Sequence, residues 1–372
     1  MQLPFLPVWL AAKGLDAASI GLVLAVPMVV RAVVIPFATH IADRYQALRA
    51  VIAAAAAAAV LGYGATGLSQ GAAAITAGFA LASAFYTPLM PLADAYAFRG
   101  LNGIGRSYGP VRLWGSAAFI GGSFAAGFLL DVIAARDLIW LIVAAMALTA
   151  AAGFALAPLA PRPGVAAPPA PPAPSAPSAR ALLRDRGFLA VAAGAGLIQA
   201  SHAVYYGFAT LDWQAAGLGG GEIATLWALA VVAEIALFAA SGRLPFKPTT
   251  LLMAGAGGAV IRWSAMAFDP LPPVLLLLQC LHALSFGATH LAAVGFVARA
   301  APVELSATAQ GHLAVALGLI MAGAMGLSGV LYARLGSLAY LAMAFAAFAG
   351  GLCALSATYS ARQMTDDRGR TT

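Results

Sequence analysis

Residues 217–238 read GLGGGEIATLWALAVVAEIALF and carry a carboxylate, Glu234, inside a mostly apolar run. A helix needs roughly 20 apolar residues to cross the hydrocarbon core of a bilayer, and this stretch has that length. A carboxylate about halfway along such a helix costs roughly a few kcal/mol, so it needs a partner or a task. We therefore expect a membrane-spanning helix here, with Glu234 as a functional side chain.

A second stretch, residues 14–37, matches this one at a constant offset of 203 positions. Gly14 aligns with Gly217, and Arg31 falls at the position of Glu234. Two parts of the chain thus carry opposite charges at equivalent depths. The match indicates an internal repeat with a polar centre.

The composition is that of a membrane protein. Hydrophobic residues make up 62% of the 372 residues and charged residues 9%, and the mean hydropathy is +0.90. A soluble protein could not cover its surface with so few charges. We predict an all-α membrane protein with twelve transmembrane helices. The first helix is truncated, because residues 1–12 are too short to cross, and an upstream start codon would explain this.

A proline-rich segment divides the chain. Residues 158–178 hold nine of the 22 prolines, and such a run can neither form a helix nor bury apolar surface. We expect a six-helix bundle over 1–160, a cytoplasmic linker over 161–186, a second six-helix bundle over 187–361 and a polar tail over 362–372. The complete spans are expected at 17–38, 48–67, 72–98, 107–133, 137–158, 187–212, 221–242, 249–268, 272–298, 305–333 and 337–360.

The basic residues behind the net charge of +7 are distributed unequally between the two sides of the predicted membrane protein. If the loops alternate sides, fifteen basic residues fall on one side and three on the other, and the positive-inside rule places the larger group in the cytoplasm. We therefore expect a bacterial cytoplasmic-membrane protein with its linker and C-terminus in the cytoplasm, and no nucleic-acid partner. The fifteen are Arg44, Arg49, Arg99, Arg106, Arg112, Arg162, Arg180, Arg184, Arg186, Arg243, Lys247, Arg299, Arg362, Arg368 and Arg370; the three are Lys13, Arg136 and Arg334.

Charged residues within apolar helices form two candidate sites. Asp94 precedes Arg112 by eighteen residues across a short loop, so a helical hairpin can pair them, for substrate binding or as a structural ion pair. Glu234, Arg262 and His282 lie on neighbouring predicted helices and supply a carboxylate, a guanidinium and an imidazole for proton coupling. Alternatively, Arg262 reaches the membrane surface as a snorkelling side chain and His282 is a packing residue.

Aromatic residues suggest a cavity on the predicted helix 187–212. His202, Tyr205 and Tyr206 offer stacking and hydrogen bonds to a substrate.

Several stretches resemble a known family. They are YGPVRLWGSAAFIGGS (108–123), SHAVYYGFATLDWQAAGL (201–218), LWALAVVAEIALF (226–238) and LAVALGLIMAG (313–323). They are similar to the 3-phenylpropionic acid transporter family of the major facilitator superfamily, over nearly the whole chain. The loop HIADRYQALR (40–49) keeps Asp43 and Arg44 of the facilitator loop signature. This resemblance implies the major facilitator fold, with substrate bound between two halves near the midplane.

A wider resemblance, to the oligosaccharide:proton symporters of the lactose permease type, implies roles for the charged residues. Asp94 and Arg112 match a substrate-binding pair, and Arg262 and His282 match the spacing of a helix-9 Arg and a helix-10 His. In that family the helix-9 Arg acts in proton release, and a helix-8 Glu like Glu234 links the sugar and proton sites.

This sequence departs from the permease pattern at one position. Ser285 stands where the helix-10 proton-carrying Glu would be. If proton coupling persists, Asp94, Glu234 or His282 must take over that role.

We therefore expect a monomeric, proton-coupled symporter for a small aromatic carboxylate, 3-phenylpropionate-like, without cofactor or metal. Arg31, Arg112 or Arg262 would attract the substrate carboxylate. Alternatives are a sugar or nucleoside symporter, or an exporter, on the same fold. An enzyme is disfavoured because the five histidines are scattered and form no H-x-x-x-H motif. A non-transporting scaffold would not need so many costly buried charges.

Overall fold

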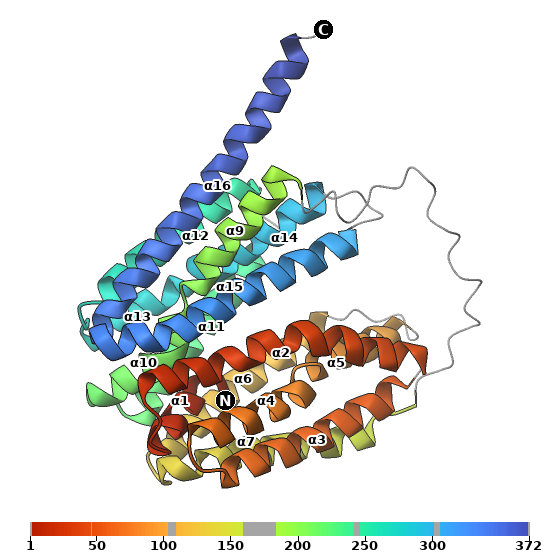
Figure 1. The fold of residues 1–372 in the computed structure, drawn as a ribbon, viewed down its shortest axis with the longest axis vertical. Coiled ribbons are helices and arrows are strands. Elements are labelled where there is room, and N and C mark those ends of the chain that lie inside the picture. The colour runs from red at the N-terminus through yellow and green to blue at the C-terminus, as the bar shows by residue number, and fades with distance from the viewer. Residues whose placement is uncertain are drawn as a thin grey trace. The chain divides into compact units, whose positions relative to one another are not determined.

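The structure is a computed structural model that describes residues 2–45, 47–102, 109–158, 184–241, 246–300 and 306–370. The secondary structure in these residues is entirely helical (Figure 1), which confirms the expected all-α class. The predicted linker over 161–186 lies almost wholly outside the described residues.

In the described residues, the first half of the chain contains eight helical elements. They are α1 (Gln2–Ala12), α2 (Ala17–Arg44), α3 (Leu48–Leu68), α4 (Ala72–Tyr86), α5 (Leu89–Asn102), α6 (Gly109–Leu130), the 3₁₀ helix η1 (Ala135–Asp137) and α7 (Leu138–Ala155).

Ten helical elements are described in the second half, between residues 184 and 370 with gaps at 242–245 and 301–305. They are α9 (Arg186–Ala200), α10 (Ala203–Ala215), α11 (Gly220–Ser241), α12 (Pro248–Met266), α13 (Pro272–Cys280), the π-helix η2 (Ala283–Ala288), α14 (Thr289–Ala300), α15 (Ser306–Leu335), the 3₁₀ helix η4 (Gly336–Leu338) and α16 (Ala339–Arg370).

Within the described residues, eight helical runs are long and apolar enough to cross a membrane. One of them, Ala309–Ser356, covers both α15 and α16. A shorter apolar helix, Trp114–Leu130, adds a further candidate. The chain is therefore a multi-pass membrane protein.

The chain divides into two compact units. Unit 1 comprises 1–170 and 207–225, and unit 2 comprises 171–206 and 226–372. Within unit 1, the start of α11 contacts the end of α6 and Asp131, which follows it. The backbone N–H of Gly220 donates to the Asp131 carboxylate at 3.0 and 3.1 Å. A Cβ on Gly220 would overlap the carbonyl oxygen of Gly127, so the two backbones meet directly.

Local geometry supports the internal repeat. Gly14 and Gly217 both adopt positive φ, 84° and 86°. Each follows a helix whose last turn closes with the same hydrogen bonds: Leu15 N–H donates to Leu10 O, and Leu218 N–H to Trp213 O. Further along, α4 starts at residue 72 and α13 at 272, while α5 starts at 89 and α14 at 289.

Three expected spans are broken helices. The span predicted at 72–98 breaks between α4 and α5 at Pro88, which has no N–H to donate. The span predicted at 187–212 breaks at Ser201 and His202, and the one at 272–298 contains the π-helix. The last helix, α16, runs to Arg370 rather than ending at 360. Its extra residues include helix-compatible Ala, Arg, Gln and Met.

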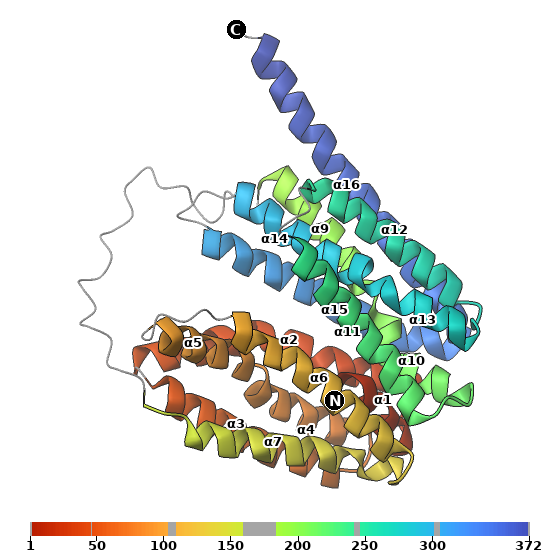
Figure 2. The same ribbon diagram turned by 180° about the vertical axis from the view of Figure 1, so that it is seen from behind.

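Unit 2 is built on close helix packing. Helix α9 lies beside α16 and α15, and α16 lies beside α12 (Figure 1 and Figure 2). Gly194 on α9 meets Gly350 on α16: a Cβ on Gly194 would come within 2.8 Å of the Gly350 carbonyl oxygen. Small residues let membrane helices approach in this way. This packing positions α12, which carries Arg262 of the site described next, and α9, which leads into His202.

Candidate functional site

Arg262 lies at the centre of a buried polar cluster in unit 2. Its side chain, on α12, is 0% exposed. The guanidinium donates to Gln279 Oε1 at 2.6 Å and to His282 Nδ1 at 3.0 Å. A longer contact, 3.5 Å, joins it to Ser285 Oγ. Arg262 therefore does not reach the surface, and the snorkelling alternative is wrong.

Two aromatic rings enclose the guanidinium. The Arg262 Cζ atom lies 4.4 Å from the ring centroid of Tyr205 and 4.6 Å from that of Trp263. Desolvated cation–π contacts of this kind stabilise a charge by about 2 kcal/mol. The Tyr205 hydroxyl also donates to Gln279 Oε1 at 2.9 Å. The rings and hydrogen bonds together offset the cost of burying this charge.

His282 connects Arg262 to Glu234. Its Nδ1 faces Arg262, and its Nε2 lies 3.6 Å from Glu234 Oε2. A guanidinium can only donate, so Nδ1 must be the acceptor and carry no proton. The ring proton is then on Nε2, directed at the Glu234 carboxylate. The structure thus brings together the three residues of the second predicted set, with His282 as a neutral ring between them.

His202 and Ser285 form a second branch. His202 Nδ1 lies 3.0 Å from the carbonyl oxygen of Gln199, so this nitrogen must donate. Its Nε2 lies 3.1 Å from Ser285 Oγ and therefore accepts the serine hydroxyl proton. The same Ser285 oxygen can accept from Arg262. At the position where the permease pattern has a carboxylate, this chain has a hydroxyl that bridges Arg262 to an imidazole.

Sequence reasoning missed several members of the cluster. Gln279 accepts hydrogen bonds from both Arg262 and Tyr205. Ser201 accepts from the Trp263 indole N–H at 2.8 Å. A polar Gln279 three residues before His282 in an apolar helix is the sequence signal that could have predicted this contact.

A row of rings extends from His282 along its helix. His282 stacks on Phe286 (centroids 5.3 Å, interplanar angle 6°), and Phe286 on His290 (6.4 Å, 5°). Phe238 on α11 contacts His290 at 6.3 Å. The π-helix η2 lies within this segment, and π-bulges are frequent at functional sites. His282 is buried, whereas His290 is exposed.

The remaining predicted residues, His202 at the α9–α10 break and two tyrosines on α10, differ in exposure. His202 and Tyr205 are fully buried, so they support the cluster rather than face an open space. Tyr206 is half-buried and stacks on His202 at 5.5 Å. Tyr205 also packs on Trp227 at 4.5 Å.

The first predicted set lies in unit 1. Asp94 is half-buried on α5, and Arg31 is exposed on α2. The backbone of Arg112 belongs to α6, but its side chain lies outside the described residues. The Asp94–Arg112 pair stays a prediction.

With this geometry established, similarity to known proteins identifies the family. A family model described as "MFS_1 like family" matches residues 1–343. The chain belongs to the MFS_1 like family. MFS denotes the major facilitator superfamily, so the resemblance inferred from the motifs is confirmed.

Two relatives are transporters. The chain is 33% identical over 354 residues to a "Probable 3-phenylpropionic acid transporter" of Escherichia coli (strain K12), covering 93% of this chain and 90% of the relative. It is 29% identical to a "Maltose permease" of Geobacillus stearothermophilus, covering 82% and 77%. This MFS protein is accordingly a transporter and not an enzyme.

Solved structures agree on the fold. The nucleoside transporter NupG matches with a TM-score of 0.80 at 15% identity, covering 96% of this chain and 94% of that one. A bacterial homologue of the human lysosomal transporter Spinster, inward-facing and occupied, matches with a TM-score of 0.70 at 16% identity, covering 96% and 94%. At these identities the likeness concerns the fold alone.

Proposed function

We propose that this MFS transporter imports a small aromatic carboxylate together with a proton across the bacterial cytoplasmic membrane. The relative at 33% identity, named as a probable 3-phenylpropionic acid transporter, supports the substrate class. The observation that carries the coupling is the chain Arg262–His282–Glu234, in which a neutral imidazole lies between a buried cation and a carboxylate.

The tautomer of His282 suggests how a proton would change the site. A second proton on this ring must go to Nδ1, the atom that accepts from Arg262. Protonation would therefore break the Arg262–His282 hydrogen bond and place two cations side by side. A proton on Glu234 instead would remove the negative charge that faces His282. Either event changes the contacts of the cluster, which is what coupling to a conformational change requires.

The proton would enter at His290 and pass to Glu234, which lies beside the row of rings; the phenyl ring of Phe286 cannot carry it. His290 is exposed, and Phe286 stacks between it and His282. Glu234 packs close to Gly287, beside Phe286. We assign His290 as the outer proton-carrying group and Glu234 as the inner one, with His282 and Arg262 responding to the charge on Glu234.

The substrate carboxylate would meet a different arginine. Arg262 is enclosed and already engaged by three side chains. The exposed Arg31, or Arg112, is therefore the better partner for a substrate carboxylate. Asp94 is the further substrate-binding candidate in unit 1. In unit 2 the candidate is the half-buried Tyr206, with His202 and Tyr205 packed against it.

The proposed organisation is that of a monomer with twelve transmembrane helices, the first of them short. Its bundles span 1–160 and 187–361, joined by a cytoplasmic linker over 161–186, and the tail 362–372 is also cytoplasmic. The eight candidate spans and the pairing of broken helices at equivalent positions support this arrangement.

A sugar symporter is the second candidate function. The relative named as a maltose permease, 29% identical, favours it. A nucleoside symporter or an exporter on the same fold would be recognised by the substrate panel described below.

Uptake by proteoliposomes tests the proposal. Vesicles containing the purified protein, and protein-free vesicles that give the passive leak of the acid, are offered labelled 3-phenylpropionate, maltose and uridine, with and without an inward proton gradient. We expect gradient-driven uptake of the aromatic acid above the leak. Uptake at the same rate with and without the gradient would disprove proton coupling. Accumulation of maltose or uridine but not of the aromatic acid would show that the proposed substrate is wrong.

Glu234→Gln tests the assigned carboxylate. We expect the variant to lose gradient-driven accumulation. Glu222→Gln is the matched control on the same helix, because Glu222 caps the backbone N–H of Gly219 at the exposed helix start. Unchanged accumulation in Glu234→Gln would remove Glu234 from the mechanism.

A further inference from the structure

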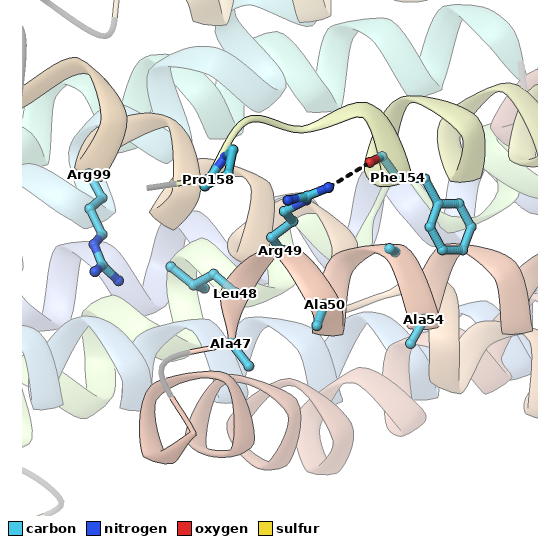
Figure 3. A pocket seen from close by; sticks show the side chains of 9 residues that line it. Ala47, Leu48, Arg49, Ala50, Ala54, Arg99, Phe154 and Pro158 are labelled. Atoms are coloured by element: carbon cyan, nitrogen blue, oxygen red, sulfur yellow. Dashed lines mark hydrogen bonds between the residues drawn. The ribbon is translucent and has the colours of Figure 1, made fainter. Parts of the chain in front are cut away.

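Unit 1 contains a pocket that the transport proposal does not use. It has a volume of about 650 Å³ and lies among the start of α3, the end of α5 and the end of α7. Arg49 and Arg99 line it together with small apolar side chains and an aromatic ring. Figure 3 shows these lining residues, among them Ala50, Ala54 and Phe154.

The two arginines bring positive charge to this pocket. Arg49 donates to the carbonyl oxygen of Phe154 at 3.1 Å (Figure 3), which orients its guanidinium at the end of α7. A guanidinium has five N–H donors, so this bond leaves others for a ligand. Arg99, in the last turn of α5, adds a second guanidinium. Both arginines line the pocket, on either side of Leu48 (Figure 3), and guanidinium groups suit the oxygens of a phosphate.

The surroundings suit an acyl chain. Ala50, Ala53 and Ala54 form a shallow apolar wall on α3, and Phe154 on α7 is 61% exposed. The same face of α3 continues with a large exposed apolar side chain, Leu61 at 75%, seven residues after Ala54. An exposed apolar surface of this kind on a spanning helix faces lipid. The pocket therefore joins a cationic end to a lipid-facing strip.

We propose that this pocket binds an anionic phospholipid of the cytoplasmic leaflet. Arg49 and Arg99 hold its phosphate, and the first part of an acyl chain lies against Ala50, Ala54 and Phe154. The helix ends here adjoin the loops that carry most of the basic residues, and such juxtamembrane arginines attract anionic headgroups. A small soluble anion would contact the arginines but not the apolar wall, so a phospholipid fits the lining better.

Native mass spectrometry of the full-length, delipidated protein in detergent tests this site. The protein is titrated with phosphatidylglycerol, with phosphatidylcholine of the same chains, and with inorganic phosphate. We expect one phosphatidylglycerol to bind more tightly than phosphatidylcholine. Arg99→Gln should weaken it about fivefold, the loss expected for one interfacial charge. Inorganic phosphate should not displace it.

Matched variants distinguish the site from general charge effects. Arg299→Gln is the control: Arg299 is an exposed arginine in the last turn of α14 that contacts the carbonyl oxygen of Gly295. Arg49→Gln could disturb the end of α7, because Arg49 bonds the Phe154 carbonyl oxygen. Ala54→Trp keeps both charges and fills the space beside the apolar wall, so it should also weaken phosphatidylglycerol binding. Equal binding of the two lipids, equal losses in Arg99→Gln and Arg299→Gln, or displacement by phosphate alone would each overturn the proposal.

Discussion

At the scale of single residues, the buried cluster of unit 2 is held by shared oxygen atoms. Gln279 Oε1 accepts from Arg262 and from Tyr205, and Ser285 Oγ accepts from Arg262 and donates to His202 Nε2. Removing Gln279 Oε1 leaves two buried donors without this acceptor, and removing the Ser285 hydroxyl leaves one donor and one acceptor without it. This arrangement makes the uncharged members of the cluster as important for stability as the charged ones.

Gln279→Met tests this dependence. The substitution removes the oxygen that receives the Arg262 and Tyr205 donors while preserving side-chain length. We expect a loss of about 1–3 kcal/mol in stability, the cost of leaving buried donors unpaired. Thermal unfolding of the purified protein in detergent measures it. Leu277→Met, at a position 71% exposed on the same helix, is the control, and equal unfolding temperatures would contradict the expectation.

His290→Phe tests the outer proton group. Phenylalanine preserves stacking on Phe286 and contact with Phe238 but cannot carry a proton. We expect slower gradient-driven accumulation with normal exchange of labelled for unlabelled substrate, because exchange moves no net proton. His40→Phe, at an exposed position on α2, should leave both rates unchanged. Equal loss of accumulation and exchange would show that His290 serves binding or folding instead.

The residues of this site that the sequence predicted are those that are unusual in an apolar helix. Glu234, Arg262 and His282 stand out there because burying charge is costly. Gln279, Ser201 and the bridging role of Ser285 do not stand out, because neutral polar residues are tolerated in membrane helices. Which nitrogen of His282 accepts from Arg262 depends on distances, which no sequence pattern contains.

At the scale of elements, the interrupted helices decide where the site lies. His202 is at the break between α9 and α10, and His282 precedes the π-helix. Proline marks the break at Pro88, so that one is visible in the sequence. No proline lies at the other two breaks, and the sequence predicted all three spans as continuous. At the break after α9 the His202 ring and backbone N–H both use the Gln199 carbonyl oxygen, and the ring is also bonded to the distant Ser285.

Gly194→Val tests the packing that supports these elements. A side chain at Gly194 would press on the backbone of α16 at Gly350 and separate α16 from α9. We expect destabilisation of about 1–3 kcal/mol, the usual cost of overpacking, measured by thermal unfolding in detergent. Gly257→Val, on α12 where nothing lies within 4 Å of the added carbon, should cost much less. Equal losses would mean that helix propensity rather than packing sets the effect.

At the scale of the whole molecule, the repeat is the feature that sequence and structure share most fully. The offset of 203 that aligned Gly14 with Gly217 recurs as matching backbone angles and hydrogen bonds. Local turns follow from short sequence patterns, so they were predictable. The division into compact units was less predictable. Residues 207–225 belong to unit 1, and the close approach of Gly127 and Gly220 within that unit depends on tertiary contact.

The charge asymmetry predicts the orientation of the whole chain, and cysteine labelling measures it. In a Cys280→Ser, Cys353→Ser background, Gln70→Cys lies between α3 and α4, and Lys247→Cys immediately precedes α12. Both positions are exposed. Because fifteen of the eighteen basic residues assigned to loops fall on the side of Lys247, that side should be cytoplasmic. A membrane-impermeant maleimide should then label Gln70→Cys in intact spheroplasts and Lys247→Cys only after permeabilisation. The reverse pattern would place the arginine-lined pocket of unit 1 at the outer leaflet and invert the direction assigned to transport.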